Sequence, residues 1–303
     1  MLDDDVIVER APAKLNLALH VRRRRPDGYR DLETLFAFAE DGDMVMLAPA
    51  DEDSFTITGP FAAALGLSHP SLSPRKRKGG AQRRKGEGEW EDNLVTRAAA
   101  AFGAAFGISQ PHAITLDKRL PVASGIGGGS ADAAATLRAL ARLHDVSPDD
   151  PKLAAIAAAL GADVPACLLG QPAFGTGRGD ALEPLEPIGG VPALLVNPGV
   201  QVSTAAVFAA WDGIDRGPIA PGAPLASARA GRNDLAAPAV AIAPVIADVL
   251  AALETQPGAI LIRMSGSGAT CFALFDAPAE RAEAAAAICA ARPDWWLLET
   301  ALA

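Results

Sequence analysis

A glycine-rich segment is the part of this sequence whose residue types are best suited to chemistry. It runs from Pro121 to Ala131 and contains Gly125 and three consecutive glycines, Gly127–Gly129. Backbone without side chains lets phosphate oxygens approach several N–H groups, and a helix that begins after Ser130 would add partial positive charge. This Gly-rich segment is therefore suited to a polyphosphate, although a run of glycines also fits a turn or a packing contact.

Three familiar phosphate-binding signatures are missing from the chain. The Gly-rich segment lacks the Gly-Lys-Ser/Thr ending of a P-loop, and Ser130 stands where a dinucleotide-binding loop needs its third glycine. The sequence also contains no His-Arg-Asp and no Asp-Phe-Gly, which mark protein kinases. These absences argue against P-loop enzymes, Rossmann dehydrogenases and protein kinases.

Other chemically capable residues lie outside the Gly-rich segment. Lys14 and Asn16 share one face of an expected strand, Asp163 follows a helix stop, and Gly266–Thr270 forms a second loop of small residues. Phosphoryl transfer to an alcohol needs dipoles that hold phosphates, a cation that balances charge and a base for the hydroxyl proton. Each residue also has a plainer explanation: a solvated lysine, a helix or turn cap, and a tight bend.

The first half of the chain alternates strand and helix patterns. Residues 6–21 alternate with period two, which places Lys14 and Asn16 on one face, and Arg25–Gly28 is typical of a turn. Further strands are expected at residues 32–38, 44–47, 54–58 and 113–116. Three helices are also expected: one capped by Asp92 that runs to about Phe106, one after Ser130 that runs to about His144, and one capped by Ser147–Pro151 that stops at Gly161.

The second half predicts a different domain. Residues 183–192 hold three prolines and two glycines, which marks a boundary. Strands are expected at residues 193–196, 260–264, 270–275 and 295–298, and helices at residues 204–211, 238–254 and 279–291. Apart from one extra helix, the order is β-α-β-β-α-β, the ferredoxin-like arrangement. The fold class is therefore α+β, with two domains in tandem and no internal repeat.

Composition and charge limit the function classes. The 303 residues are 50% hydrophobic, enough for two cores, and the net charge of −9 disfavours nucleic acid and anionic lipid as partners. Cys167, Cys271 and Cys289 are widely spaced, which argues against a disulfide framework or a zinc site. The acidic start and the absence of a long apolar run predict a cytoplasmic protein without a membrane span.

One stretch fits neither domain. Residues 68–91 are polar and Gly-rich, and they contain seven positive charges, in Arg75–Lys78 and Arg83–Lys85, with no acidic residue between them. Such a stretch is typical of a polyanion-binding patch or of a solvated, disordered surface insertion. We expect the insertion, because no aromatic side chain occurs before Trp90.

Three segments together carry a family resemblance. Ala11–Leu17, Pro121–Ala131 and Met264–Gly268 resemble, in that order, the three motifs of the GHMP kinases, which include galactokinase, homoserine kinase and mevalonate kinase. The resemblance covers almost the whole chain except residues 68–91. It implies a two-domain GHMP kinase fold, with an N-terminal ribosomal-protein-S5-like α/β domain at residues 1–185 and a C-terminal ferredoxin-like domain at residues 190–303.

The resemblance also implies a reaction and its residues. The chain would transfer a phosphoryl group from ATP, with Mg²⁺, to an alcohol, and Lys14 and Asp163 would be catalytic. The ATP phosphate loop would consist of Pro121, Val122, Ala123, Ser124, Gly125, Ile126, Gly127, Gly128, Gly129, Ser130 and Ala131.

Four further segments resemble one branch of the family, whose alcohol substrate carries a diphosphocytidyl group and serves isoprenoid synthesis. They are Arg25–Tyr29, Glu91–Leu94, Leu160–Pro165 and Asn197–Val200. The implied substrate contacts are Asn16, Tyr29, Arg30, Thr204 and Phe208, with Tyr29 beside the cytosine.

The chain departs from that branch at two positions. Arg30 stands where the branch usually has His, and Ala131 replaces its second Ser. An arginine side chain donates hydrogen bonds but accepts none, so cytosine contacts through this side chain would differ while backbone contacts would survive.

Two other functions are also consistent with the sequence. The chain could be another GHMP kinase, of the homoserine or mevalonate type, with the same loops serving a different alcohol. It could also be an inert nucleotide-binding or RNA-binding protein that uses the basic stretch. The presence of both Lys14 and Asp163 favours an enzyme with a small-molecule substrate.

Overall fold

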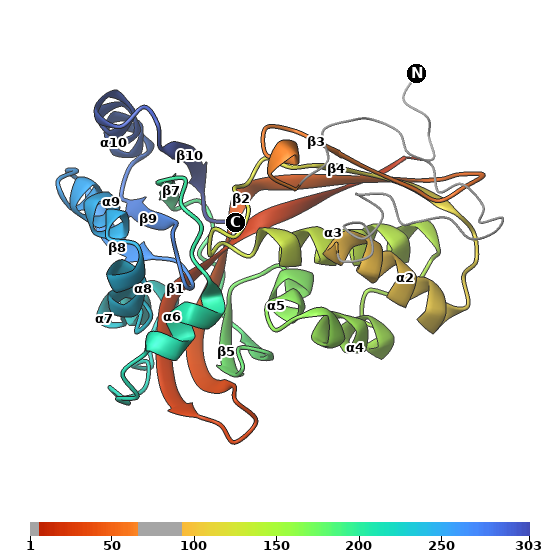
Figure 1. Cartoon of the computed structure of the whole chain (residues 1–303), viewed down its shortest axis with the longest axis horizontal. Helices are drawn as coiled ribbons and strands as arrows, with labels where there is room; N and C mark the ends of the chain where they lie inside the picture. The colour runs from red at the N-terminus through yellow and green to blue at the C-terminus, as the bar shows by residue number, and fades with distance from the viewer. Residues whose placement is uncertain (1–5, 66–92) are drawn as a thin grey trace, which may run out of the picture. The chain divides into compact units, whose positions relative to one another are not determined.

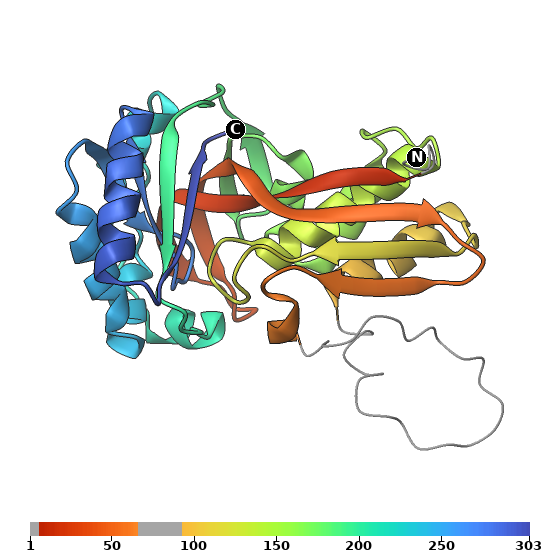
Figure 2. The same ribbon diagram turned by 90° about the horizontal axis from the view of Figure 1, so that it is seen from above.

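A computed structural model describes residues 6–65 and 93–303, so the expectation for residues 68–91 lies outside the described residues. The chain forms two compact units that interleave along the sequence (Figures 1 and 2). Unit 1 consists of Met1–Ala11, Gly42–Val122 and Gly129–Leu168, and unit 2 of Pro12–Asp41, Ala123–Gly128 and Leu169–Ala303. The domain boundary between residues 185 and 190 is a different division of the chain and stays a prediction.

Unit 1 contains a small mixed sheet. Strand β2 (Arg30–Pro49) enters this unit with Met44–Pro49, which pairs antiparallel with β4 (His112–Asp117). Strand β3 (Ser54–Thr58) pairs parallel with β4, and its burial alternates along the strand, as expected for a half-buried sheet. The short 3₁₀ helix η1 (Ala62–Leu65) follows β3.

The described helices of unit 1 lie close together (Figure 1). Asn93 caps the first of them, since its Oδ1 accepts a hydrogen bond from Val95 N at 2.9 Å, and Gly107 ends it with a φ of +69°. The prediction that Asp92 caps this helix is therefore wrong, because the N-cap is Asn93. The helices are α2 (Leu94–Phe106), α3 (Gly128–Leu143), α4 (Pro151–Leu160) and α5 (Val164–Leu169).

Unit 2 begins with a hairpin of β1 (Ile7–Arg24) and β2. The expected turn between them is confirmed: Gly28 has a φ of +87° and its N–H donates to Arg25 O at 3.1 Å. Further along β2, Leu32–Phe36 pairs with β5 (Ala173–Gly177), which pairs with β6 (Ala181–Pro184). The two strands expected at residues 32–38 and 44–47 are parts of one continuous strand.

The ferredoxin-like arrangement is confirmed in unit 2. Strands β7 (Pro192–Asn197), β8 (Ala259–Met264), β9 (Cys271–Phe275) and β10 (Trp296–Ala301) form an antiparallel sheet in the order β10-β7-β9-β8. Every residue of β7 and β9 is buried, as expected of the two central strands. Helices α9 (Val245–Glu254) and α10 (Pro278–Ala291) cover one face of the sheet (Figure 2).

The remaining helices of unit 2 are short. They are α6 (Thr204–Ala210), α7 (Pro224–Ala230) and α8 (Ala236–Ile242). The single helix expected at residues 238–254 is wrong, because Pro244 lacks the N–H that would continue α8 into α9. Among the described residues, no helix has both the length and the apolar character needed to cross a bilayer.

Candidate functional site

Strand β1 carries a buried lysine. Lys14 and Asn16 are 2% and 3% exposed, and Lys14 Nζ donates a hydrogen bond to Asn16 Oδ1 at 2.9 Å. The prediction that these side chains share one face is confirmed. The alternative of a solvated lysine is wrong, and a buried ammonium held by an amide is the kind of group that functional sites use.

The amide of Asn16 has a fixed orientation. Its Oδ1 accepts from Lys14, while its Nδ2 donates to Thr34 Oγ1 at 2.8 Å, and Thr34 Oγ1 in turn donates to Ala18 O at 2.8 Å. Lys14 Nζ also lies 5.3 Å from the centroid of the Phe36 ring, within cation–π range. The position of the ammonium is therefore set by neighbours on both β1 and β2.

The three segments that carry the family resemblance meet within unit 2. Lys14 N donates to Ile126 O at 2.9 Å, and Asn16 N donates to Ser265 Oγ at 3.2 Å. Ser265 Oγ then donates to Gly125 O at 3.0 Å. Ser265, which directly precedes the second loop (Gly266–Thr270), therefore joins β1 to the Gly-rich segment, so this loop has a role beyond that of a tight bend.

Glycines let the two loops touch through their backbones. Gly125 has a φ of +79°, and a Cβ there would lie 2.6 Å from Ser265 O and 2.7 Å from Gly268 O. Gly266 has a φ of +54°, and its Cβ would lie 2.7 Å from Gly125 O. Since real Cβ atoms do not approach oxygen so closely, both positions need glycine for space as well as for conformation.

Asn233 holds the second loop and was not identified from the sequence. Its Nδ2 donates to Met264 O at 2.7 Å and to Gly266 O at 2.8 Å, and its Oδ1 accepts from Leu235 N at 2.9 Å. No motif around Asn233 distinguishes it from a turn asparagine, so this role depends on contacts that only the folded chain shows.

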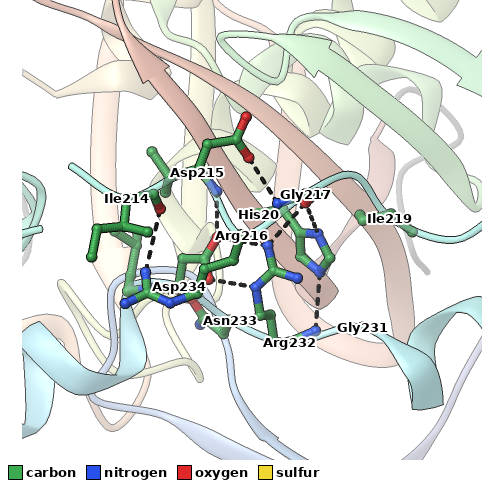
Figure 3. A network of polar contacts seen from close by, with 12 residues as sticks. His20, Ile214, Asp215, Arg216, Gly217, Ile219, Gly231, Arg232, Asn233 and Asp234 are labelled. Carbon is green, nitrogen blue, oxygen red and sulfur yellow. Dashed lines mark hydrogen bonds and ion pairs between the residues drawn. The ribbon is translucent and has the colours of Figure 1, made fainter. Parts of the chain in front are cut away.

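A polar network around His20 holds the chain on either side of Asn233 (Figure 3). His20 Nδ1 lies 3.0 Å from Gly217 O, and its Nε2 accepts from Arg232 N at 3.1 Å. Because a carbonyl only accepts and a backbone N–H only donates, the ring must be neutral with its proton on Nδ1. Burial lowers the pKa of His20, which agrees with the neutral form.

The predicted substrate contacts fall into two groups within unit 2. Arg30 Nη1 donates to Gly28 O at 2.6 Å and its Nη2 to Phe208 O at 3.0 Å, so Arg30 joins the β1–β2 turn to α6. Tyr29 is 53% exposed, and the guanidinium carbon of Arg178 lies 5.1 Å from its ring centroid. Arg178 was not identified from the sequence.

Thr204 belongs with the second loop. Its Oγ1 lies 2.9 Å from Ser267 Oγ, and Thr204 and Phe208 are four residues apart on α6, hence on one helix face. Helix α6 therefore contacts the second loop through Thr204 and Arg30 through Phe208 O.

Unit 1 contains the other predicted residues. The ends of the Gly-rich segment, Pro121–Val122 and Gly129–Ala131, belong to it. Asp163 is half-buried between α4 and α5, and its carbonyl accepts from Cys167 N at 3.1 Å. Lys14 belongs to unit 2, so the joint action of Lys14 and Asp163 stays a prediction.

A buried ion cluster in unit 1 was also not identified from the sequence. Lys118 Nζ donates to Asp43 Oδ2 at 2.5 Å and to Asp132 Oδ2 at 2.7 Å, and all three side chains are buried. Burial raises the pKa of Asp132 to about 8, against the opposing charge of Lys118. The two carboxylates raise the pKa of Lys118 although its burial acts to lower it.

Residues 6–65 and 93–303 contain no group of three or more His, Cys, Asp or Glu side chains that could hold a metal ion. Mg²⁺ in kinase sites is bound largely by substrate phosphates and water with one or two carboxylates, so such a cluster is not required.

Comparisons with known proteins agree with the arrangement of motifs. Residues 93–171 match the model of the GHMP kinases N terminal domain, and residues 221–294 match that of the GHMP kinases C terminal domain.

A relative from Rhizorhabdus wittichii, named 4-diphosphocytidyl-2-C-methyl-D-erythritol kinase, is 54% identical over 97% of this chain and 94% of its own length. A crystal structure of 4-(cytidine 5'-diphospho)-2C-methyl-D-erythritol kinase is 34% identical, with a TM-score of 0.76 over 98% of this chain and 100% of that chain. Homoserine kinase from Cytophaga hutchinsonii, at 19% identity over 100% of this chain and 96% of that chain with a TM-score of 0.67, shares the fold.

Proposed function

The chain belongs to the GHMP kinase family, and we propose that it transfers the γ-phosphoryl group of ATP to the 2-hydroxyl of 4-diphosphocytidyl-2-C-methyl-D-erythritol. This reaction is a step of the non-mevalonate, or methylerythritol phosphate, route to isopentenyl diphosphate. The observation that carries the proposal is the 54% identity, over nearly the full length of both chains, to a relative that bears the name of this kinase.

The chemistry needs a base, a cation and a phosphate cradle. Asp163 accepts the proton of the substrate hydroxyl, the hydroxyl oxygen bonds to the γ-phosphorus, and ADP leaves with the electron pair of the broken P–O bond. Lys14 offsets the negative charge on the transferring group. Its ammonium is suited to this, because Asn16 holds it in a buried position.

The Gly-rich segment is the proposed phosphate cradle. Its backbone N–H groups and the N-terminus of α3, a helix of 16 residues, provide donors and partial positive charge for ATP. Mg²⁺, bound mainly to ATP oxygens and water, would neutralise further phosphate charge. The glycine contacts between residues 125 and 266 support the requirement for a bare backbone.

The cytidine end of the substrate is assigned to the exposed residues near the β1–β2 turn. Arg178 covers one side of the Tyr29 ring, which leaves the other side for a stacked base. Arg30 donates hydrogen bonds to Gly28 O and Phe208 O, so its proposed role is to hold α6 against the β1–β2 turn. Thr204, Phe208 and Asn16 complete the proposed substrate contacts.

The substrate assignment is tested with a panel of alcohols. Purified protein, ATP and Mg²⁺ are incubated with the diphosphocytidyl substrate, homoserine or mevalonate, and ADP release and the phosphorylated product are measured. We expect product only from the diphosphocytidyl substrate. Phosphorylation of homoserine or mevalonate instead would assign the chain to another branch, and no turnover of any alcohol would contradict the kinase proposal.

We assign the protein to the cytoplasm, where its nucleotide substrate is abundant. Cys167, Cys271 and Cys289 are all free thiols, which suits a reducing compartment. Fractionation of the source cells would test this assignment, and enzyme activity in a membrane or periplasmic fraction alone would contradict it.

A further inference from the structure

The buried ion cluster of Asp43, Lys118 and Asp132 lies at both ends of the Gly-rich segment. Lys118 precedes Pro121 by three residues, and Asp132 directly follows Ala131. The hydrogen bonds of Lys118 Nζ to both aspartates therefore tie the chain before the segment to Asp132, the fifth residue of α3.

Asp43 also holds the backbone that leads into the segment. Its Oδ1 accepts hydrogen bonds from Arg119 N at 2.5 Å and from Leu120 N at 2.8 Å. Its other oxygen, Oδ2, accepts from Lys118. One fully buried carboxylate on β2 therefore fixes three consecutive residues just before Pro121.

Stability alone does not explain such a cluster. Burying two carboxylates and an ammonium costs desolvation energy, and well-packed apolar side chains of similar size are often as stabilising. The hydrogen bonds are directional, whereas apolar packing would not specify the distance between the two ends of the segment as narrowly. The cluster therefore contributes geometry that the segment needs.

The charge of the cluster also suits a phosphate site. With all three groups ionised it would carry a net negative charge, next to the backbone assigned to ATP phosphates. Burial favours the protonated form of Asp132, and Asp132 Oδ1 has no hydrogen-bond donor in the described part of the chain. With Asp132 protonated and both Asp43 and Lys118 ionised, the cluster is electrically neutral.

We propose that Asp43, Lys118 and Asp132 are positioning residues that set the separation of the two ends of the Gly-rich segment and thereby the affinity for ATP. The inference rests on the proposed function only in assigning this segment to ATP. It concerns none of the residues assigned to the alcohol substrate.

Lys118→Met tests the geometric part. We expect the Kd of ATP, measured by calorimetry, and the KM of ATP to rise at least tenfold, while kcat at saturating ATP stays within threefold and the KM of the alcohol is unchanged. Lys152→Met is the matched control, because Lys152 is an exposed lysine of unit 1 that donates to Ala105 O. A folded Lys118→Met protein with unchanged ATP affinity would overturn the inference, as would equal losses for ATP and alcohol.

Asp132→Asn provides a second test that does not depend on the folding of the first variant. In the wild type, ATP affinity should fall at least threefold between pH 7 and pH 9, because loss of the Asp132 proton leaves a net negative charge from Asp43, Lys118 and Asp132. In Asp132→Asn this fall should be absent. Parallel pH profiles of ATP affinity in the two proteins would overturn the part of the inference that concerns the charge of Asp132. Calorimetry with ATP alone separates this result from the substrate assignment, since no alcohol is present.

Discussion

The two units hold their parts of the Gly-rich segment by different physical means. In unit 1 the ends of the segment depend on a buried cation between two carboxyl groups, Asp43 and Asp132. In unit 2 the centre of the segment depends on neutral groups: Ser265 Oγ, the backbone of Lys14, and glycines that touch backbone oxygens. Gain or loss of one proton changes the charge of an ion cluster, whereas hydrogen bonds between neutral groups keep their geometry over a wide pH range.

This difference predicts which substitutions destabilise each unit. Removing one partner of a buried ion pair leaves an uncompensated charge and costs roughly 3–5 kcal/mol, whereas one net hydrogen bond contributes about 1 kcal/mol. We therefore expect the loss of a single charged group to destabilise unit 1 strongly. In unit 2, the same loss of stability should require the loss of several neutral contacts. The following predictions test this contrast.

The largest effect should come from removing one proposed catalytic residue in each unit. Asp163→Asn keeps the shape of the side chain but removes the base, and Lys14→Met removes the cation. Each should lower kcat at least 100-fold, the usual scale for such groups, in steady-state assays at saturating substrates. An effect confined to the KM of the alcohol would make the changed residue a binding residue.

Asn233→Ala should destabilise unit 2 strongly for a neutral side chain. The change leaves two buried carbonyls and one N–H without their partner, at a cost of about 2 kcal/mol in the free energy of unfolding by denaturant. Asn93→Ala is the control in unit 1, because it removes one helix cap and should cost about 1 kcal/mol. Equal losses in the two variants would refute the role assigned to Asn233.

Gly125→Ala should weaken ATP binding through crowding between the two loops. The added Cβ would meet Ser265 O and Gly268 O, so one of the two loops must shift. Gly190→Ala is a matched control, because Gly190 has the same φ of +79° but nothing within 4 Å of its Cβ position. We expect a tenfold rise in the KM of ATP for Gly125→Ala and no change for Gly190→Ala. The same KM of ATP in both variants would contradict crowding of the two loops at residue 125.

Acid should destabilise both units through buried and half-buried histidines. Burial lowers the pKa of His20 in unit 2 and of His112 and His144 in unit 1, where the two Nε2 atoms lie 2.9 Å apart. The unfolded chain therefore binds more protons as the pH falls below about 6.5, and stability is lost in that direction by at most about 1.4 kcal/mol per pH unit for each histidine.

Denaturant unfolding at pH 7.5 and at pH 5.5 measures this loss. His144→Gln should reduce the loss, since it removes one of the groups that must titrate. A free energy of unfolding that is constant or rises on going to pH 5.5 would contradict the assignment of neutral histidines.

The smallest effect is expected from the basic stretch. Deletion of residues 69–89, which lie outside the described residues, should leave kcat within about twofold and increase protease resistance, because its composition offers no apolar stripe to bury. Loss of folding or of kinase activity after the deletion would show that the stretch is part of the fold or of the site.

Local patterns in the sequence predicted much of the fold. Period-two alternation placed Lys14 and Asn16 together on β1, and the order of strands and helices after residue 192 gave the ferredoxin-like sheet. Hydrophobic periodicity did not identify elements that are short or interrupted by glycine. Strand β5 was not predicted because Gly175 and Gly177 interrupt it, β6 is only four residues long and ends at Pro184, and α7 is only seven residues long.

The support of the site could not be predicted, because it depends on residues far apart in the chain. Asn16 and Ser265 are separated by 249 positions, and Lys118 and Asp43 by 75. A lone serine, asparagine or lysine has no local pattern that distinguishes a buried partner from a solvated side chain. The family resemblance identified the motifs themselves, since these are contiguous in sequence.

The kinetics of the double variant Lys14→Met/Asp163→Asn test the central claim most directly, namely that Lys14 and Asp163 act in the same chemical step. Residues that act as a unit have non-additive effects, so the double variant should have a kcat close to that of the slower single variant. A kcat reduced by the product of the two single effects, about 10⁴-fold or more, would contradict the claim and show that Lys14 and Asp163 act independently.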